Sequence, residues 1–131
     1  MNYLAHLLCS PGSQDFLLGN VVADLVKGRA DGRFPAGVAA GIRHHRMLDS
    51  YTDGHESFLA SRRLISAIRR RYAGIIVDVL YDHFLTLDWD RYAAVGLDEF
   101  VDRVYEHLGC CGPWMPDEAR TVIEKMIHGD W

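Results

Sequence analysis

Two segments of this chain place imidazole and carboxylate side chains at four-residue intervals among apolar residues. Residues 41–53 read GIRHHRMLDSYTD and residues 78–83 read DVLYDH. Side chains four residues apart share one face of an α-helix. The spacing therefore predicts one helix that presents His45, Asp49 and Asp53 on a single face, and a second that presents Asp78 and Asp82.

Neutral imidazole and carboxylate groups are the side chains that bind Mg, Mn, Fe or Zn in proteins. The two segments thus predict a divalent metal site built on helices. For Asp82 and His83, adjacent on an apolar helix, the alternative is an ion pair with an arginine of a neighbouring helix.

Helical periodicity recurs along the whole chain, and no segment reads as a strand, an internal repeat or a low-complexity region. With 131 residues, 49% of them hydrophobic, the chain has room for one domain with a core. We therefore expect a single all-α domain over residues 1–131, with about six helices. The expected helices cover residues 14–27, 35–53, 56–72, 75–87, 99–108 and 116–131.

The expected helix at residues 14–27 is apolar around most of its circumference, apart from a stripe of Asn20, Asp24 and Lys27. This stripe either faces solvent or faces an internal polar site, and a buried carboxylate needs partners there. Similarly, His6 interrupts an apolar N-terminal segment. Taken alone, it is expected to be a histidine at the edge of the core, paired with a backbone carbonyl.

Five arginines gather on the expected helix at residues 56–72, in a chain whose formal net charge is -4. They form either a solvated face or a docking surface for an acidic partner. The overall charge gives no footprint for nucleic acid, and no segment has the length of a membrane span. The arginines are Arg62, Arg63, Arg69, Arg70 and Arg71.

The three cysteines, Cys9, Cys110 and Cys111, are odd in number, and two of them are adjacent. Adjacent cysteines close a disulfide only with strain, so a reducing, cytoplasmic compartment fits this composition best. The opening segment, MNYLAHLLCS, has no basic stretch of the kind that begins a secretory signal.

Four segments together resemble the motifs of bacterial acyl carrier protein phosphodiesterases, in the same order and with similar spacing. They are MNYLAHL at the start, GNVVADLVKG at residues 19–28, GIRHHRMLDSYTD at residues 41–53 and VDVLYDHFL at residues 77–85. The resemblance implies a helical, cytoplasmic hydrolase related to the HD-type metal-dependent phosphohydrolases. It also implies a reaction that releases 4′-phosphopantetheine from the serine of holo-acyl carrier protein, with Mn2+ as the usual metal and Mg2+ or Fe2+ as alternatives.

Carried over by position, the resemblance implies roles for several side chains of this chain. His6 or His83 would protonate the leaving serine oxygen, and Asp78 would orient a histidine or the attacking water. Because the implied substrate is an acidic carrier protein, the five arginines are expected to be its docking surface. The implied metal ligands are Asp24, His45, Asp49 and Asp82, with His83 as a further candidate.

Members of this family continue for several helices beyond the position of Trp131, so an abbreviated version of a longer protein is expected. An apolar end exposed in this way could support a homodimer. Two other functions fit the same residues: an HD-type phosphohydrolase that acts on nucleotides, and a helical module that binds acyl carrier protein without cleaving it.

Overall fold

The computed structural model describes residues 2–110 and 112–129. Within these residues the chain forms seven α-helices, three short 3-10 segments and no strand, which confirms the all-α prediction. Among the same residues, no helix combines the length and apolar character needed to cross a membrane. The helices are α1 (Tyr3–Leu8), α2 (Gln14–Val22), α3 (Ala36–Gly54), α4 (Glu56–Leu64), α5 (Ala73–Leu87), α6 (Leu97–Gly109) and α7 (Asp117–Gly129).

Helices α2 and α3 pack backbone against backbone at the centre of the fold. A Cβ atom added to Gly41 of α3 would lie 2.1 Å from the carbonyl oxygen of Phe16, and one added to Gly19 of α2 would lie 2.1 Å from that of Val38. Such a close approach requires glycine at both positions. The contact holds Asn20 of α2, which follows Gly19, close to His45 of α3.

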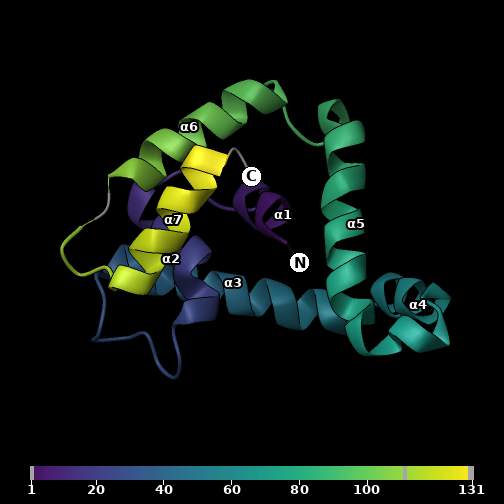
Figure 1. Ribbon diagram of the computed structural model, residues 1–131. Helices are drawn as coiled ribbons and strands as arrows, with labels where there is room; N and C mark the ends of the chain where they lie inside the picture. The colour runs from purple at the N-terminus through teal and green to yellow at the C-terminus, as the bar shows by residue number, and fades with distance from the viewer. Residues whose placement is uncertain (1, 111, 130–131) are drawn as a thin grey trace.

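The other helices surround this pair and complete the core. Leu108 of α6 and Ile123 of α7 are buried in the same apolar cluster as Leu18 and Val22 of α2. In Figure 1, α7 is drawn in front of α2, α6 runs above them and contacts both, and α5 stands at the far end of α3. Short helix α1 lies inside the arc formed by α3, α5 and α6, and it contacts both α2 and α5.

The predicted helix at residues 56–72 is wrong as a single element. It ends at Leu64, Ile65 is extended with φ -70° and ψ 131°, and a 3-10 segment follows at Ala67–Tyr72. The β-branched Ile65 and the following Ser66 both have weaker helix propensity than the residues before them. As a result, Leu64 and Ile68 are 86% and 95% exposed rather than buried with Phe58.

The predicted helix at residues 14–27 also ends early, at Val22, and a 3-10 turn at Ala23–Leu25 follows. Val26 is extended, and Gly28 has a φ of 76°, a left-handed conformation that ends the segment as expected. Asp24 therefore lies on a tight turn at the end of α2. Cys9 and Cys110 are free thiols, whereas the expectations for Cys111 and Trp131 fall outside the described residues.

Candidate metal centre

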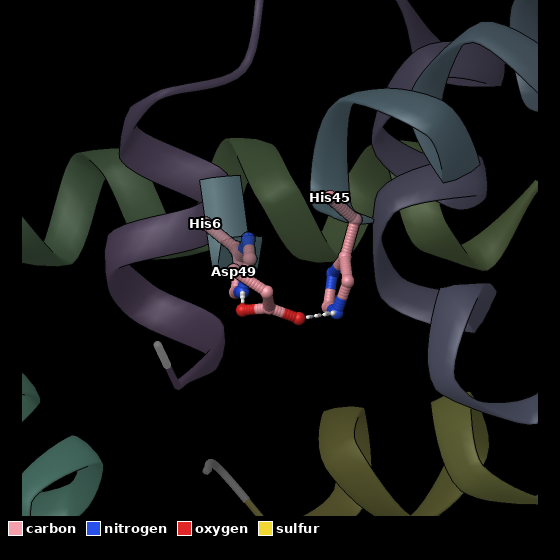
Figure 2. A group of neighbouring side chains, drawn as sticks. All are labelled: His6, His45 and Asp49. Atoms are coloured by element: carbon pink, nitrogen blue, oxygen red, sulfur yellow. Dashed lines mark hydrogen bonds and ion pairs between the residues drawn. The ribbon is translucent and has the colours of Figure 1, made fainter. Parts of the chain in front are cut away.

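Asp49 connects two histidines that belong to different helices. Its Oδ1 atom lies 3.0 Å from Nε2 of His6 on α1, and its Oδ2 atom lies 3.1 Å from Nε2 of His45, one turn earlier on α3. Figure 2 shows the carboxylate between the two imidazoles, with one oxygen turned toward each ring. A single carboxylate thus fixes α1 against α3.

Asp24 approaches the same imidazole from the turn after α2. Its Oδ1 atom is 3.2 Å from Nε2 of His45, and the contact with His45 is the main cause that lowers the pKa of the Asp24 carboxyl group. The side chain of Asp24 is 69% exposed and that of Asp49 is 34% exposed, while His45 is buried. The group of side chains is therefore anchored in the core and open to solvent on the Asp24 side.

His6 is the most deeply enclosed member of the group, with 2% of its surface exposed. Burial, followed by the neighbouring His45, lowers the pKa of its imidazole from 6.5 to about 4, against the opposing effect of Asp49. His6 is therefore neutral at physiological pH, which is the state in which imidazole binds metals. Its Nδ1 atom is buried with no hydrogen-bond partner among the described residues.

Asn20 contacts the other nitrogen of His45, on the side away from the carboxylates. Its Oδ1 atom lies 2.9 Å from Nδ1 of His45. Asn20 is 1% exposed and His45 is 3% exposed, so this contact is shielded from water. The same amide group also reaches α1 and the turn after it, where its Nδ2 atom donates to the backbone oxygen of His6 and to the hydroxyl of Ser10.

Asp82 lies at the N-terminus of α1. Its two carboxylate oxygens accept hydrogen bonds from the backbone N–H groups of Leu4 and Ala5, at 2.9 and 3.1 Å. Burial raises the pKa of Asp82, while these two N–H groups act in the opposite direction. In this position Asp82 anchors the helix that carries His6. Its predicted role as a metal ligand stays a prediction.

Asp78 lies four residues before Asp82 on α5 and shares its face of the helix, whereas His83 follows Asp82 and lies on the neighbouring face. Burial raises the pKa of the Asp78 carboxyl group, and the nearby charges of Asp53 and Asp49 raise it further. His83 is exposed and, with Asp82, lines a cavity of about 750 Å³ between α1, α5, α6 and α7. The catalytic roles of Asp78 and His83 remain predictions. Asp78 lies near enough to the metal centre for the charge of Asp49 to affect its pKa.

The α4 arginine cluster comprises Arg62 and Arg63 of α4 and Arg69, Arg70 and Arg71 of the following 3-10 segment. All five are exposed. Arg62, Arg63 and Arg70 line a shallow hollow of about 260 Å³. None of the five pairs with a carboxylate among the described residues, so the cluster leaves unneutralised positive charge on the surface.

The structure thus brings together three of the four predicted ligands, Asp24, His45 and Asp49, and adds His6 to them. Ligand atoms of His6, His45 and Asp49 all lie within 4.8 Å of one another. Two imidazoles and two carboxylates form a donor set that suits a divalent cation. In the sequence taken alone, His6 is a polar residue within an apolar segment, which does not distinguish a ligand from a core histidine, and the family resemblance implied a proton donor there.

Comparison with known proteins identifies the family. The sequence model of the family described as acyl carrier protein phosphodiesterase matches residues 1–131. A relative of that name from Photorhabdus laumondii is 46% identical across the whole of this chain, which spans 67% of the relative. One from Yersinia enterocolitica is 40% identical over 84% of this chain and 55% of its own length.

A third relative with the same name, from Escherichia coli, is 39% identical across the whole of this chain and 68% of its own length. The chain therefore spans between about half and about two thirds of the curated relatives it matches. No solved structure matches it. The match along the full chain, together with these identities, shows that the chain belongs to the acyl carrier protein phosphodiesterase family.

Proposed function

We propose that this chain hydrolyses the phosphodiester that joins 4′-phosphopantetheine to the serine of holo-acyl carrier protein, and that it uses a divalent cation. The observation that carries the proposal is the convergence of His6, His45, Asp49 and Asp24 at the junction of three helical segments. Membership of the acyl carrier protein phosphodiesterase family supports the choice of substrate. The proposal keeps the cytoplasmic location that the family implies.

His45, Asp49, Asp24 and His6 would hold the cation, and Mn2+ is the first candidate, with Mg2+ or Fe2+ as alternatives. When bound, a divalent cation withdraws charge from the non-bridging phosphate oxygens and acidifies a water molecule at neutral pH. The open side at Asp24 is where a phosphodiester can approach from solvent. We propose Asp82 as the anchor of α1 in this centre, because both of its oxygens are engaged by backbone N–H groups.

Proton transfer is the second requirement of the reaction. Water adds to phosphorus, the bond from phosphorus to the serine oxygen breaks, and the serine oxygen must receive a proton. A histidine with a pKa of about 4 holds little proton at neutral pH, so we propose His6 as a ligand instead of the general acid. We propose His83, which is exposed in the cavity beside Asp82, as the proton donor, and Asp78 as the group that orients the attacking water.

The carrier protein itself requires a docking surface, and we propose the α4 arginine cluster for this role. Acyl carrier protein is acidic, so a chain with a net charge of -4 needs a local basic surface to attract it. Because none of these five arginines forms an ion pair with another described residue, their charges are available to a partner. A second basic segment, which contains Lys27, Arg29 and Arg33, is a weaker candidate, because the Arg33 guanidinium already donates to the backbone oxygens of Lys27 and Arg29.

The mass of holo-acyl carrier protein, incubated with the purified chain and either Mn2+ or EDTA, tests the reaction. We expect loss of the 4′-phosphopantetheine mass with Mn2+ only, and no loss with the Asp24→Ala or His45→Ala variants. Glu124→Gln, an exposed change on α7, is the matched control and should retain activity. Metal-dependent binding of the carrier protein without mass loss would contradict hydrolysis and favour a binding module. Cleavage restricted to small nucleotides would favour a nucleotide phosphohydrolase.

A further inference from the structure

The orientation of the Asn20 side-chain amide is fixed by its contacts with α1. Its Nδ2 atom lies 3.1 Å from the backbone oxygen of His6 and also contacts the hydroxyl oxygen of Ser10. The Ser10 hydroxyl in turn donates to the backbone oxygen of His6 over 2.8 Å, so the Ser10 oxygen is free to accept. Both partners of Nδ2 are therefore acceptors, and this position must be the NH2 group.

The oxygen of the same amide must then face His45. Oδ1 of Asn20 lies 2.9 Å from Nδ1 of His45, and an amide oxygen only accepts hydrogen bonds. Nδ1 of His45 must therefore carry the proton. In a neutral imidazole the other nitrogen, Nε2, is then an unprotonated lone pair.

This lone pair points at two carboxylates. Nε2 of His45 lies 3.2 Å from Oδ1 of Asp24 and 3.1 Å from Oδ2 of Asp49. In the neutral form of His45 these are three converging acceptors, which repel one another unless a cation or a second proton lies between them. We propose that Asn20 is a positioning residue that fixes the tautomer of His45, so that Nε2 is offered to the metal. This inference rests on the metal centre of the proposed function.

Without Asn20, the opposite tautomer would have the advantage. A proton on Nε2 can be donated to either Asp24 or Asp49, and this hydrogen bond would occupy the ligand atoms and leave Nδ1 free. A cation would then have to displace that proton before binding. Outer groups that orient a metal-binding histidine typically affect metal affinity by about 10-fold to 100-fold.

The tautomer can be measured directly in the metal-free protein. We would record the imidazole nitrogen shifts of 15N-histidine-labelled chain in EDTA at about pH 9, where free imidazole is neutral. His45→Gln identifies the His45 signals among the seven histidines. We expect a protonated Nδ1 and an unprotonated Nε2 for His45. A proton on Nε2 in the wild-type chain would overturn the proposal, whether or not any variant folds.

Two substitutions at Asn20 separate positioning from general packing. Asn20→Ala removes the acceptor, so we expect the His45 proton to move to Nε2 and Mn2+ affinity, measured by calorimetry, to fall about 10-fold to 100-fold. Asn20→Asp keeps an oxygen opposite Nδ1 and should keep the proton there, even where the lost NH2 group lowers stability. Gln14→Ala, which removes an exposed amide from the same helix, is the control and should leave both readouts unchanged.

A folded Asn20→Ala chain that retains the proton on Nδ1 and binds Mn2+ like the wild type would overturn the proposal. These readouts do not depend on catalysis. A wild-type chain with the expected tautomer and Mn2+ binding, but with no hydrolysis of acyl carrier protein, would contradict the proposed reaction and still support the role of Asn20.

Discussion

The imidazole rings of His6 and His45 stack face to face, with centroids 3.8 Å apart and planes inclined by 6°. His6 comes from the short helix α1 and His45 from the long helix α3, so this stacking is a contact between the N-terminus and the centre of the fold. Asp49 binds one nitrogen of each ring. The metal centre therefore depends on how firmly α1 is held against α3.

Asp82 is predicted to control this placement through its hydrogen bonds to Leu4 and Ala5. Replacing Asp82 with Ala removes a helix cap, a change that costs about 1 kcal/mol and corresponds to about fivefold faster amide exchange at Leu4 and Ala5. Mn2+ affinity should fall as well, because α1 carries His6. Asp82→Asn keeps one acceptor oxygen, so its amide exchange at Leu4 and Ala5 should rise less and its Mn2+ affinity should fall less than in Asp82→Ala. Unchanged exchange at Leu4 and Ala5 in Asp82→Ala would contradict the anchoring role.

His6 is predicted to make the metal-free protein sensitive to mild acid. Its pKa is lowered from 6.5 to about 4, so between these values the unfolded chain binds a proton that the folded chain does not. Stability should therefore be fully present above pH 6.5 and fall as the pH drops toward 4, by about 3 kcal/mol in total. Urea unfolding in EDTA at several pH values measures this loss.

His6→Gln provides the control for that measurement, since glutamine does not titrate. The pH dependence attributable to His6 is the difference between the wild-type and variant curves, which removes the contributions of Asp78 and Asp82. Those two carboxyl groups have raised pKa values and act with the opposite sign, because their folded forms bind protons more readily than their unfolded forms. Parallel curves for the two proteins would show that His6 is not buried in neutral form.

The close contact between α2 and α3 predicts different outcomes for two glycines on the same helix. Gly41→Ala would drive a methyl group into the backbone oxygen of Phe16, so we expect a loss of more than about 3 kcal/mol in the free energy of unfolding. Gly54→Ala meets open space at the end of α3 and should be neutral, or stabilising by up to about 1 kcal/mol. Urea unfolding compares the two, and equal losses would contradict this packing.

The α4 arginine cluster predicts a difference between large and small substrates. Reversing Arg62, Arg63 and Arg70 to Glu should lower turnover of holo-acyl carrier protein by at least about 10-fold and flatten its dependence on salt concentration. Hydrolysis of a small phosphodiester should be unchanged. Lys125→Glu, an exposed change on α7, serves as the control. An equal loss on both substrates would assign the arginines to the fold or to the metal centre.

The sequence was sufficient to predict the helical class and the pairing of His45 with Asp49. A four-residue interval on one helix fixes their relative position, since this depends only on local geometry. Asp24 was predicted on family resemblance, and the structure brings it to the same His45 nitrogen. Contacts of this kind join residues far apart in the chain, and helical periodicity alone does not reveal them.

The placement of α1 could not be predicted from the sequence. Taken alone, His6 was interpreted as an ordinary core histidine, and the family resemblance made it a candidate proton donor, because nothing within its short segment indicates which helix it packs against. Asp82 was predicted to be a metal ligand, and only the structure shows that its oxygens accept hydrogen bonds from the backbone N–H groups of α1. The break at Ile65 was also missed, since the apolar and arginine spacings of residues 56–72 are compatible with a continuous helix.

The most direct test of the metal centre is an anomalous difference map from crystals of the chain soaked in Mn2+. We predict a peak about 2.0–2.4 Å from Nε2 of His45 and from carboxylate oxygens of Asp49 and Asp24, with His6 completing the set. A peak against Asp82 and His83 instead, or no peak at a concentration that supports hydrolysis, would contradict the assignment of these four side chains as the metal ligands.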